Sequence, residues 1–210
     1  MPYWRTLIPA SAAIFVLPFV PTADAHHAMG GKLPSTVLQG LLSGLGHPII
    51  GIDHLAFIMG VGLMAHLVGR IALLPLLFVA GTILGCLLHI QGYDLPWSEL
   101  GIAASVVVAA GIVATHTRVP IIILSSLFVV AGAFHGYAYG ESIIGAEWTP
   151  LAAYVVGFAV IQYCIAVATG TALGMVAKRA SVSETMVMRL AGAGMALVAA
   201  FAFVNIALVG

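Results

Sequence analysis

The sequence predicts an all-α membrane protein, a polytopic bundle of about six transmembrane helices preceded by an N-terminal signal or first helix. Of the 210 residues, 62% are hydrophobic and only 7% are charged, whereas roughly a quarter of the residues of a soluble domain are charged. The apolar residues gather in stretches of about 20, the length that crosses a bilayer core about 30 Å thick. This composition excludes an ordinary soluble enzyme, a disordered chain and a protein that binds nucleic acid through a basic patch.

The first 25 residues have the pattern of a secretory signal peptide. Arg5 supplies the positive charge at the start, an apolar stretch follows, and Ala23-Asp24-Ala25 forms a small-residue cleavage site. Cleavage there would place the new N-terminus, with His26 and His27, on the periplasmic side of a bacterial inner membrane. A retained first helix is the alternative interpretation of this segment.

Residues 26–210 contain no linker or soluble segment, so we expect them to form a single transmembrane domain. The predicted spans are 48–69, 71–90, 97–116, 119–139, 149–175 and 186–208. A short helix near 35–45 is expected before the first span, because the apolar stretch that contains both is too long for one crossing. We expect the break at Gly44, Gly46 and Pro48, since proline lacks the amide proton that a helix needs and disfavours helix in the preceding residue.

The charged residues outside the spans predict the orientation of the bundle. One set of alternate loops carries most of the basic residues, namely Arg70, Arg118, Lys178 and Arg179. The other set carries Lys32 and the acidic residues Asp94, Glu99, Glu141 and Glu147. Short cytoplasmic loops of membrane proteins are enriched in Lys and Arg. The first set is therefore predicted to be cytoplasmic, which agrees with a periplasmic N-terminus.

Ionisable residues inside a span are costly and usually functional, and the first predicted span contains three of them. His47 and His54 are seven residues apart, so on one continuous helix they would share a face. Asp53 would point toward a neighbouring helix or accept a hydrogen bond from an imidazole. Imidazole and carboxylate ligands together suit Ni²⁺, Co²⁺, Zn²⁺ or Cu²⁺. We therefore expect a metal site, with a metal-free hydrogen-bond network between helices as the alternative.

A second polar group lies at the outer end of the fourth span. His135 is the main candidate ligand there, and Tyr139 and Glu141 follow it at the same end. His89 closes the second span on the same side. Tyr139, Glu141 and His89 are weaker candidates, as are His26 and His27 near the expected mature N-terminus. Most of the histidines thus lie on the outer side, as a mouth that captures metal would require.

Two motifs resemble the signature of the HupE/UreJ family: His47-Pro48-x-x-Gly51-x-Asp53-His54, followed by Val61-Gly62, and Phe134-His135-Gly136-x-Ala138. The family consists of small bacterial membrane proteins with a signal peptide and about six spans, associated with hydrogenase and urease gene sets. They are regarded as nickel or cobalt permeases. The resemblance implies that the metal is the substrate and that His47, Asp53, His54 and His135 are the functional positions. A tyrosine stands at 139 where a second histidine is usual, so the chain resembles a divergent branch.

Two other functions are compatible with the sequence. The chain could be a non-transporting accessory subunit that binds metal or packs into a homo-oligomer or a larger membrane complex. An intramembrane metalloenzyme fits less well, because no HExxH motif accompanies the histidines. Transport is the leading hypothesis, with the bilayer as the main partner and no catalytic residue or prosthetic group expected. No P-loop for ATP is found, so the membrane potential or a coupled ion would supply the driving force.

Overall fold

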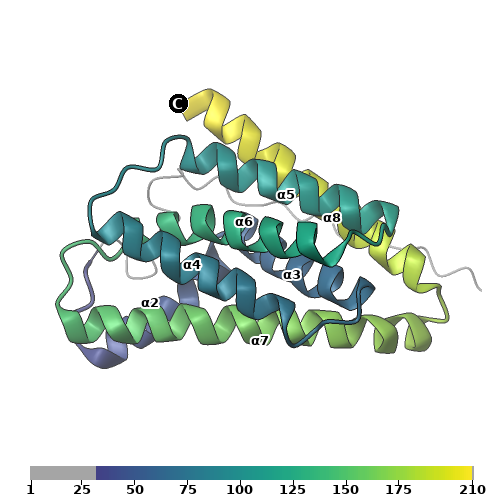
Figure 1. The fold of residues 1–210 in the computed structure, drawn as a ribbon, viewed down its shortest axis with the longest axis horizontal. Coiled ribbons are helices and arrows are strands. Elements are labelled where there is room, and N and C mark those ends of the chain that lie inside the picture. The colour runs from purple at the N-terminus through teal and green to yellow at the C-terminus, as the bar shows by residue number, and fades with distance from the viewer. Residues whose placement is uncertain (1–31, 210) are drawn as a thin grey trace, which may run out of the picture.

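A computed structural model describes residues 32–209, and within this range the chain forms seven helices and no strand (Figure 1). The helices are α2 (Val37–Ile50), α3 (Ile52–Leu67), α4 (Leu74–Ile90), α5 (Ser98–Thr115), α6 (Ile121–Glu141), α7 (Trp148–Ala180) and α8 (Glu184–Val209). The predicted all-α bundle is confirmed. The expected signal peptide, with His26 and His27 after it, lies outside the described residues.

Each predicted span corresponds to one helix, from α3 to α8. By length and composition, α5, α6, α7 and α8 are long enough to cross a membrane, and the bent pair of α2 and α3 counts as a fifth candidate. The apolar helix α4 has 17 residues, which is the short limit for a transmembrane helix at roughly 17 residues. The long helices lie side by side along one axis, and α2 lies against the first half of α7 (Figure 1).

The chain bends by 81° between α2 and α3. A break in this segment was predicted at Gly44, Gly46 and Pro48, but all three lie inside α2, so the predicted position is wrong. The bend falls at Gly51, which is extended at φ −72° and ψ 102°. The reason is packing: Gly44 rests directly on the backbone of Tyr154 in α7, and this contact keeps α2 helical past its proline.

Small residues let the helix backbones approach closely. On α4, a β-carbon at Gly85 would collide with the backbone of Ala133 in α6. On α6, a β-carbon at Gly136 would collide with the backbone of Thr82 in α4. Such close approach provides the van der Waals contact that holds helices together in lipid, where the hydrophobic effect between them is absent. The α4–α6 pair is thereby fixed beside the buried polar residues described below.

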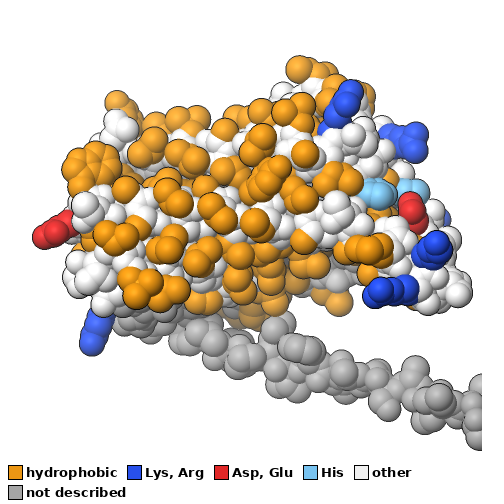
Figure 2. All heavy atoms as spheres, turned by 90° about the horizontal axis from the view of Figure 1, so that it is seen from below, with side chains coloured by type: hydrophobic (Ala, Val, Ile, Leu, Met, Phe, Trp, Pro, Cys, Tyr) orange, Lys and Arg blue, Asp and Glu red, His pale blue; other side chains and the backbone are white. Residues whose placement is uncertain are grey.

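The surface separates into an apolar middle and charged ends. Figure 2 shows hydrophobic side chains over most of the face in view, with most of the visible Lys and Arg side chains at one end. At that end, the last turns of α3 and α5 lie beside the start of α8. His66 lies 3.7 Å from Glu184, and the Thr185 hydroxyl lies 3.1 Å from His116 Nδ1. An apolar belt between charged ends is the surface that a bilayer requires.

Substituting Gly85 by alanine tests the close α4–α6 contact. We expect Gly85→Ala to destabilise the bundle by about 1–3 kcal/mol, because the added methyl group collides with rigid backbone. The apparent melting temperature of the detergent-solubilised protein measures the change. Gly194→Ala in α8 is the matched control, since its β-carbon meets no atom within 4 Å and alanine favours helix by roughly 0.5–1 kcal/mol. Equal melting temperatures for the two variants would contradict the packing described here.

Candidate metal site

Three histidines from three helices meet in the interior of the bundle. His47 of α2, His54 of α3 and His135 of α6 are each 0% exposed. The ring centroids of His47 and His54 are 5.8 Å apart, and those of His54 and His135 are 4.9 Å apart. On a continuous helix, seven residues would separate His47 from His54 by about 10.5 Å along the axis. The interpretation that they share one helix face is therefore wrong, and the bend at Gly51 is what brings them together.

A hydrogen-bond chain fixes the protons of two of the imidazoles. Ser105 on α5 donates its hydroxyl proton to the Ile102 carbonyl at 2.6 Å, so its oxygen accepts from His135 Nε2 at 2.9 Å. With its proton on Nε2, a neutral His135 has a lone pair on Nδ1, 2.7 Å from Nδ1 of His54. His54 must then donate from Nδ1, which leaves its own lone pair on Nε2.

His47 is held in the same tautomer by a different set of groups. The hydroxyl groups of Tyr154 and Ser142 both donate to the Tyr139 carbonyl oxygen, at 2.9 and 3.0 Å. Their oxygens lie 3.0 and 3.1 Å from His47 Nδ1. The two hydroxyl oxygens also lie 3.0 Å from each other. With both hydroxyl protons directed at the Tyr139 carbonyl, we infer that His47 Nδ1 is the donor to both oxygens. Its lone pair is therefore on Nε2, as it is in a metal-binding histidine whose other nitrogen is hydrogen-bonded.

Asp53 fixes the first turn of α3, where the bend ends. Its Oδ1 accepts a hydrogen bond from the backbone amide of His54 at 2.8 Å. A carboxylate at this position also interacts favourably with the positive end of the helix dipole. Gly51 allows the arrangement, because a β-carbon there would lie 2.5 Å from Cδ2 of His54. Asp53 therefore contributes negative charge and orientation directly beside the histidine.

Tyr139 lies against both His47 and His54, with ring centroids 4.9 and 4.7 Å away. Its side chain is buried, and among the described residues its hydroxyl has no hydrogen-bond partner. Leaving a buried polar group unpaired costs about 1–3 kcal/mol, so native proteins usually match such a group with water or a ligand. This hydroxyl marks the histidine cluster, defined as His47, His54 and His135, as a place where a polar ligand would be stabilised.

Comparison with known proteins places the chain in a family. The family model described as HupE / UreJ protein matches residues 14–202. The chain belongs to the HupE/UreJ family. The chain is also similar to "Protein HupE" of Rhizobium leguminosarum bv. viciae, with 29% identity over 164 residues, which are 77% of this chain and 83% of that protein. No solved structure matches.

The resemblance inferred from the two motifs is thus confirmed, and each HupE/UreJ motif contributes to the cluster. The first spans the bend, with His47 before it and His54 after it. The second places His135 on α6, one helical turn from Tyr139. Of the weaker candidates, Tyr139 contacts the cluster, whereas Glu141 and His89 do not. Glu141 is exposed at the end of α6, and His89 packs against Tyr137 with ring centroids 4.1 Å apart.

Three partners of the histidines were not predicted from the sequence. Ser142 and Tyr154 lie 95 and 107 residues from His47 in the chain, so no local pattern connects them. Ser105 is a polar residue within an apolar run of α5, and this is a signal that could have singled it out. Each of the three holds the proton of an imidazole nitrogen in place.

No three His, Cys, Asp or Glu side chains in residues 32–209 are arranged so that they could hold a metal ion together. The contact between His54 and His135 explains why, since it occupies the Nδ1 atoms of both rings. A metal ion could be coordinated through the lone pairs on Nε2 of His47 and His54 in two ways. Either the rings turn, or a further ligand such as water or Tyr139 completes the coordination of the ion. In the arrangement described here, His54 and His135 are joined by a hydrogen bond.

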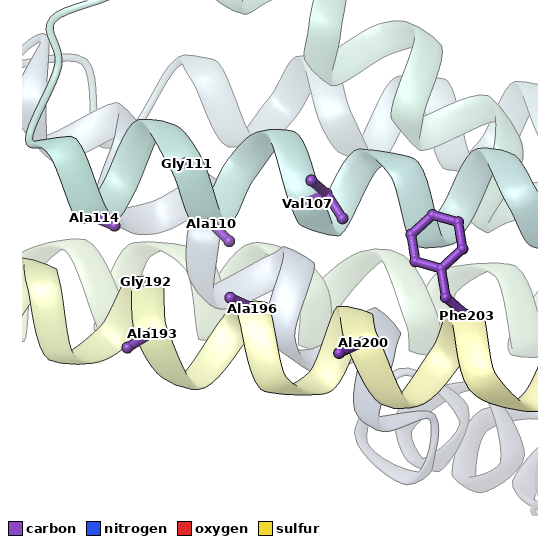
Figure 3. Close-up of a pocket in the computed structure, with 9 residues that line it drawn as sticks. All are labelled: Val107, Ala110, Gly111, Ala114, Gly192, Ala193, Ala196, Ala200 and Phe203. Atoms are coloured by element: carbon purple, nitrogen blue, oxygen red, sulfur yellow. The ribbon is translucent and has the colours of Figure 1, made fainter.

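A groove with a volume of ≈ 470 Å³ lies elsewhere, between α5 and α8. Figure 3 shows that its lining side chains are small or apolar: Val107, Ala110, Gly111, Ala114, Gly192, Ala193, Ala196, Ala200 and Phe203. None of these side chains can bind a cation. This groove therefore offers no ligand for a metal ion, in contrast to the buried histidine cluster.

Removing the Ser105 hydroxyl tests the assigned tautomers. In Ser105→Ala, His135 Nε2–H loses its acceptor, so we expect a second tautomer of His135 and a loss of about 1–3 kcal/mol of stability. Nitrogen-15 NMR of histidine-labelled protein distinguishes the protonated ring nitrogen from the unprotonated one. Ser126→Ala is the control, because Ser126 is exposed and bonds only the Ile122 carbonyl. A wild-type His135 protonated on Nδ1 would contradict the assignment.

Proposed function

We propose that this protein is a secondary permease for a divalent transition-metal ion, with nickel as the foremost substrate and cobalt next. The single observation that carries the proposal is the meeting of three fully buried histidines from three helices. Membership of the HupE/UreJ family, which is linked to nickel and cobalt transport, supports the choice of ion. Burying three imidazoles in a membrane bundle is costly unless they bind something.

The proton arrangement suits an ion that must bind and then leave. His47 and His54 present lone pairs on Nε2, and Asp53 adds a negative charge at the start of α3. Imidazole nitrogen is a good ligand for Ni²⁺, Co²⁺, Zn²⁺ and Cu²⁺. Two neutral imidazoles replace only part of the hydration shell of the ion, so binding stays weak enough for release, as permeation requires.

The ion would enter from the end of the bundle opposite the Lys and Arg residues. The cluster lies in the half of the bundle where α6 ends and α7 begins. His135 is in the last two turns of α6, and Tyr154, which contacts His47, is in the first two turns of α7. With the basic end in the cytoplasm, that half faces the periplasm of a bacterial inner membrane. The membrane potential then favours inward movement of a doubly charged ion by about 4.6 kcal/mol per 100 mV.

Uptake of radioactive Ni²⁺ by proteoliposomes tests the permease directly. We expect His54→Ala and Asp53→Asn to lower the initial rate at least about tenfold, because each removes a group that binds the cation or orients its ligand. His116→Ala is the control, since His116 lies at the opposite end of the bundle beside Thr185. Equal rates for wild type, His54→Ala and Asp53→Asn would exclude the proposed site. Binding without any flux in wild-type liposomes would favour an accessory subunit that only binds metal.

The proposed orientation has its own test, with single cysteines at the two ends of the bundle. In a background with Cys86 and Cys164 replaced by alanine, Glu147→Cys is expected to react with a membrane-impermeant maleimide added to intact spheroplasts. Arg179→Cys is expected to react only after the membrane is permeabilised. Both native positions, Glu147 and Arg179, are exposed, so access to the reagent depends on the side of the membrane alone. The reverse pattern would place the histidine cluster on the cytoplasmic side.

A further inference from the structure

Beyond the histidine cluster, one more strongly polar side chain is buried in the bundle. Gln162 on α7 is 0% exposed. Its Nε2 donates to Thr82 Oγ1 of α4 over a long 3.5 Å, and its Oε1 has no hydrogen-bond partner among the described residues. The other buried polar side chains in residues 32–209 are Ser43, His47, His54, Thr82, Ser105 and His135.

The orientation of the Gln162 amide follows from its neighbour. The Thr82 hydroxyl donates its only proton to the Val79 carbonyl at 2.8 Å, so Oγ1 can only accept from Gln162. The NH₂ group therefore faces Thr82, and the carbonyl oxygen is the end left unmatched. A buried carbonyl without a donor is uncommon in native proteins and calls for a ligand or a water molecule.

Gln162 lies at the depth of His135, because the backbone of its partner Thr82 packs against Gly136, the residue after His135. On α7 it follows the His47 partner Tyr154 by eight residues, or about 12 Å at ~1.5 Å per residue, toward the basic end. The next turn of α7 packs on α3, where Ala166 meets the backbone of Gly62. Because α3 and α7 run in the same direction, Gln162 stands about one turn past His54. Beyond this level, the buried side chains of α3 are apolar, including Val61, Met64 and Leu67.

We propose that Gln162, oriented by Thr82, is a second binding station for the divalent cation, beside the inner member of the histidine cluster, His135, and before the apolar inner half of the bundle. The proposal rests on the permease function proposed above. The amide oxygen is a neutral and harder ligand than imidazole, so it binds a partly hydrated ion more weakly. An ion that leaves the histidines would find a favourable contact here before it meets the apolar segment, which lowers the barrier to movement without trapping the ion.

A pair of substitutions separates an oxygen ligand from a packing residue. Gln162→Met fills the same space without an oxygen, and Gln162→Glu keeps a side-chain carbonyl oxygen at the same position. If Gln162 is a station for the ion, the maximal rate of Ni²⁺ uptake by proteoliposomes falls at least about fivefold in Gln162→Met and is largely retained in Gln162→Glu. The Ni²⁺ dissociation constant at the histidine cluster, measured by equilibrium dialysis of the full chain, stays within about twofold of wild type in both variants.

Three outcomes would contradict the proposal that Gln162 binds the cation. Wild-type uptake by Gln162→Met would show that the oxygen is not used. Equally low rates in Gln162→Met and Gln162→Glu would show that the residue only packs. Failure of the wild-type protein to move Ni²⁺ at all, relative to protein-free liposomes, would overturn the permease and this station with it. The first two outcomes leave the permease intact, so the two failures are distinguishable.

Discussion

The bend at Gly51 is the constraint on which the rest of the site depends. Without it, the rings of His47 and His54 would lie about two helical turns apart, and these two imidazoles could not share one ligand. The 81° turn brings their centroids to 5.8 Å. With the His54 ring in its observed position, residue 51 has no room for a β-carbon, because a β-carbon there would collide with that ring. Asp53 completes the turn by accepting the amide proton of His54.

Burial of the imidazoles then dictates their surroundings. In a low-dielectric interior each ring nitrogen that carries a proton needs an acceptor. Ser105 supplies one for His135, and the hydroxyl oxygens of Ser142 and Tyr154 do so for His47. These hydroxyl groups donate their own protons to backbone carbonyls, so they accept from the imidazoles. The tautomers of His135 and His47 follow from this. Two buried groups have no hydrogen-bond partner among the described residues, the Tyr139 hydroxyl and the Gln162 carbonyl. A polar ligand would be stabilised most by a hydrogen bond or a coordination bond to these groups.

Much of this could be predicted from the sequence, and the exceptions have physical causes. The six helices from α3 to α8 follow from apolar length, and the four main candidate site residues follow from their polarity within those helices and from two family motifs. The position of the bend could not be predicted, because packing of Gly44 on α7 outweighs the helix-breaking tendency of Pro48. The partners Ser142 and Tyr154 depend on contacts between residues about 100 positions apart, which no local pattern contains.

The central claim is that the bend makes His47 and His54 a shared site for a divalent cation, and anomalous X-ray scattering tests it most directly. Crystals of the full chain soaked in NiCl₂ would be measured on both sides of the nickel absorption edge. We expect a single strong anomalous peak roughly 2.0–2.1 Å from Nε2 of both histidines, the usual length of a metal–imidazole bond. Nickel bound only at other residues, with the hydrogen bond between His54 and His135 intact, would contradict it.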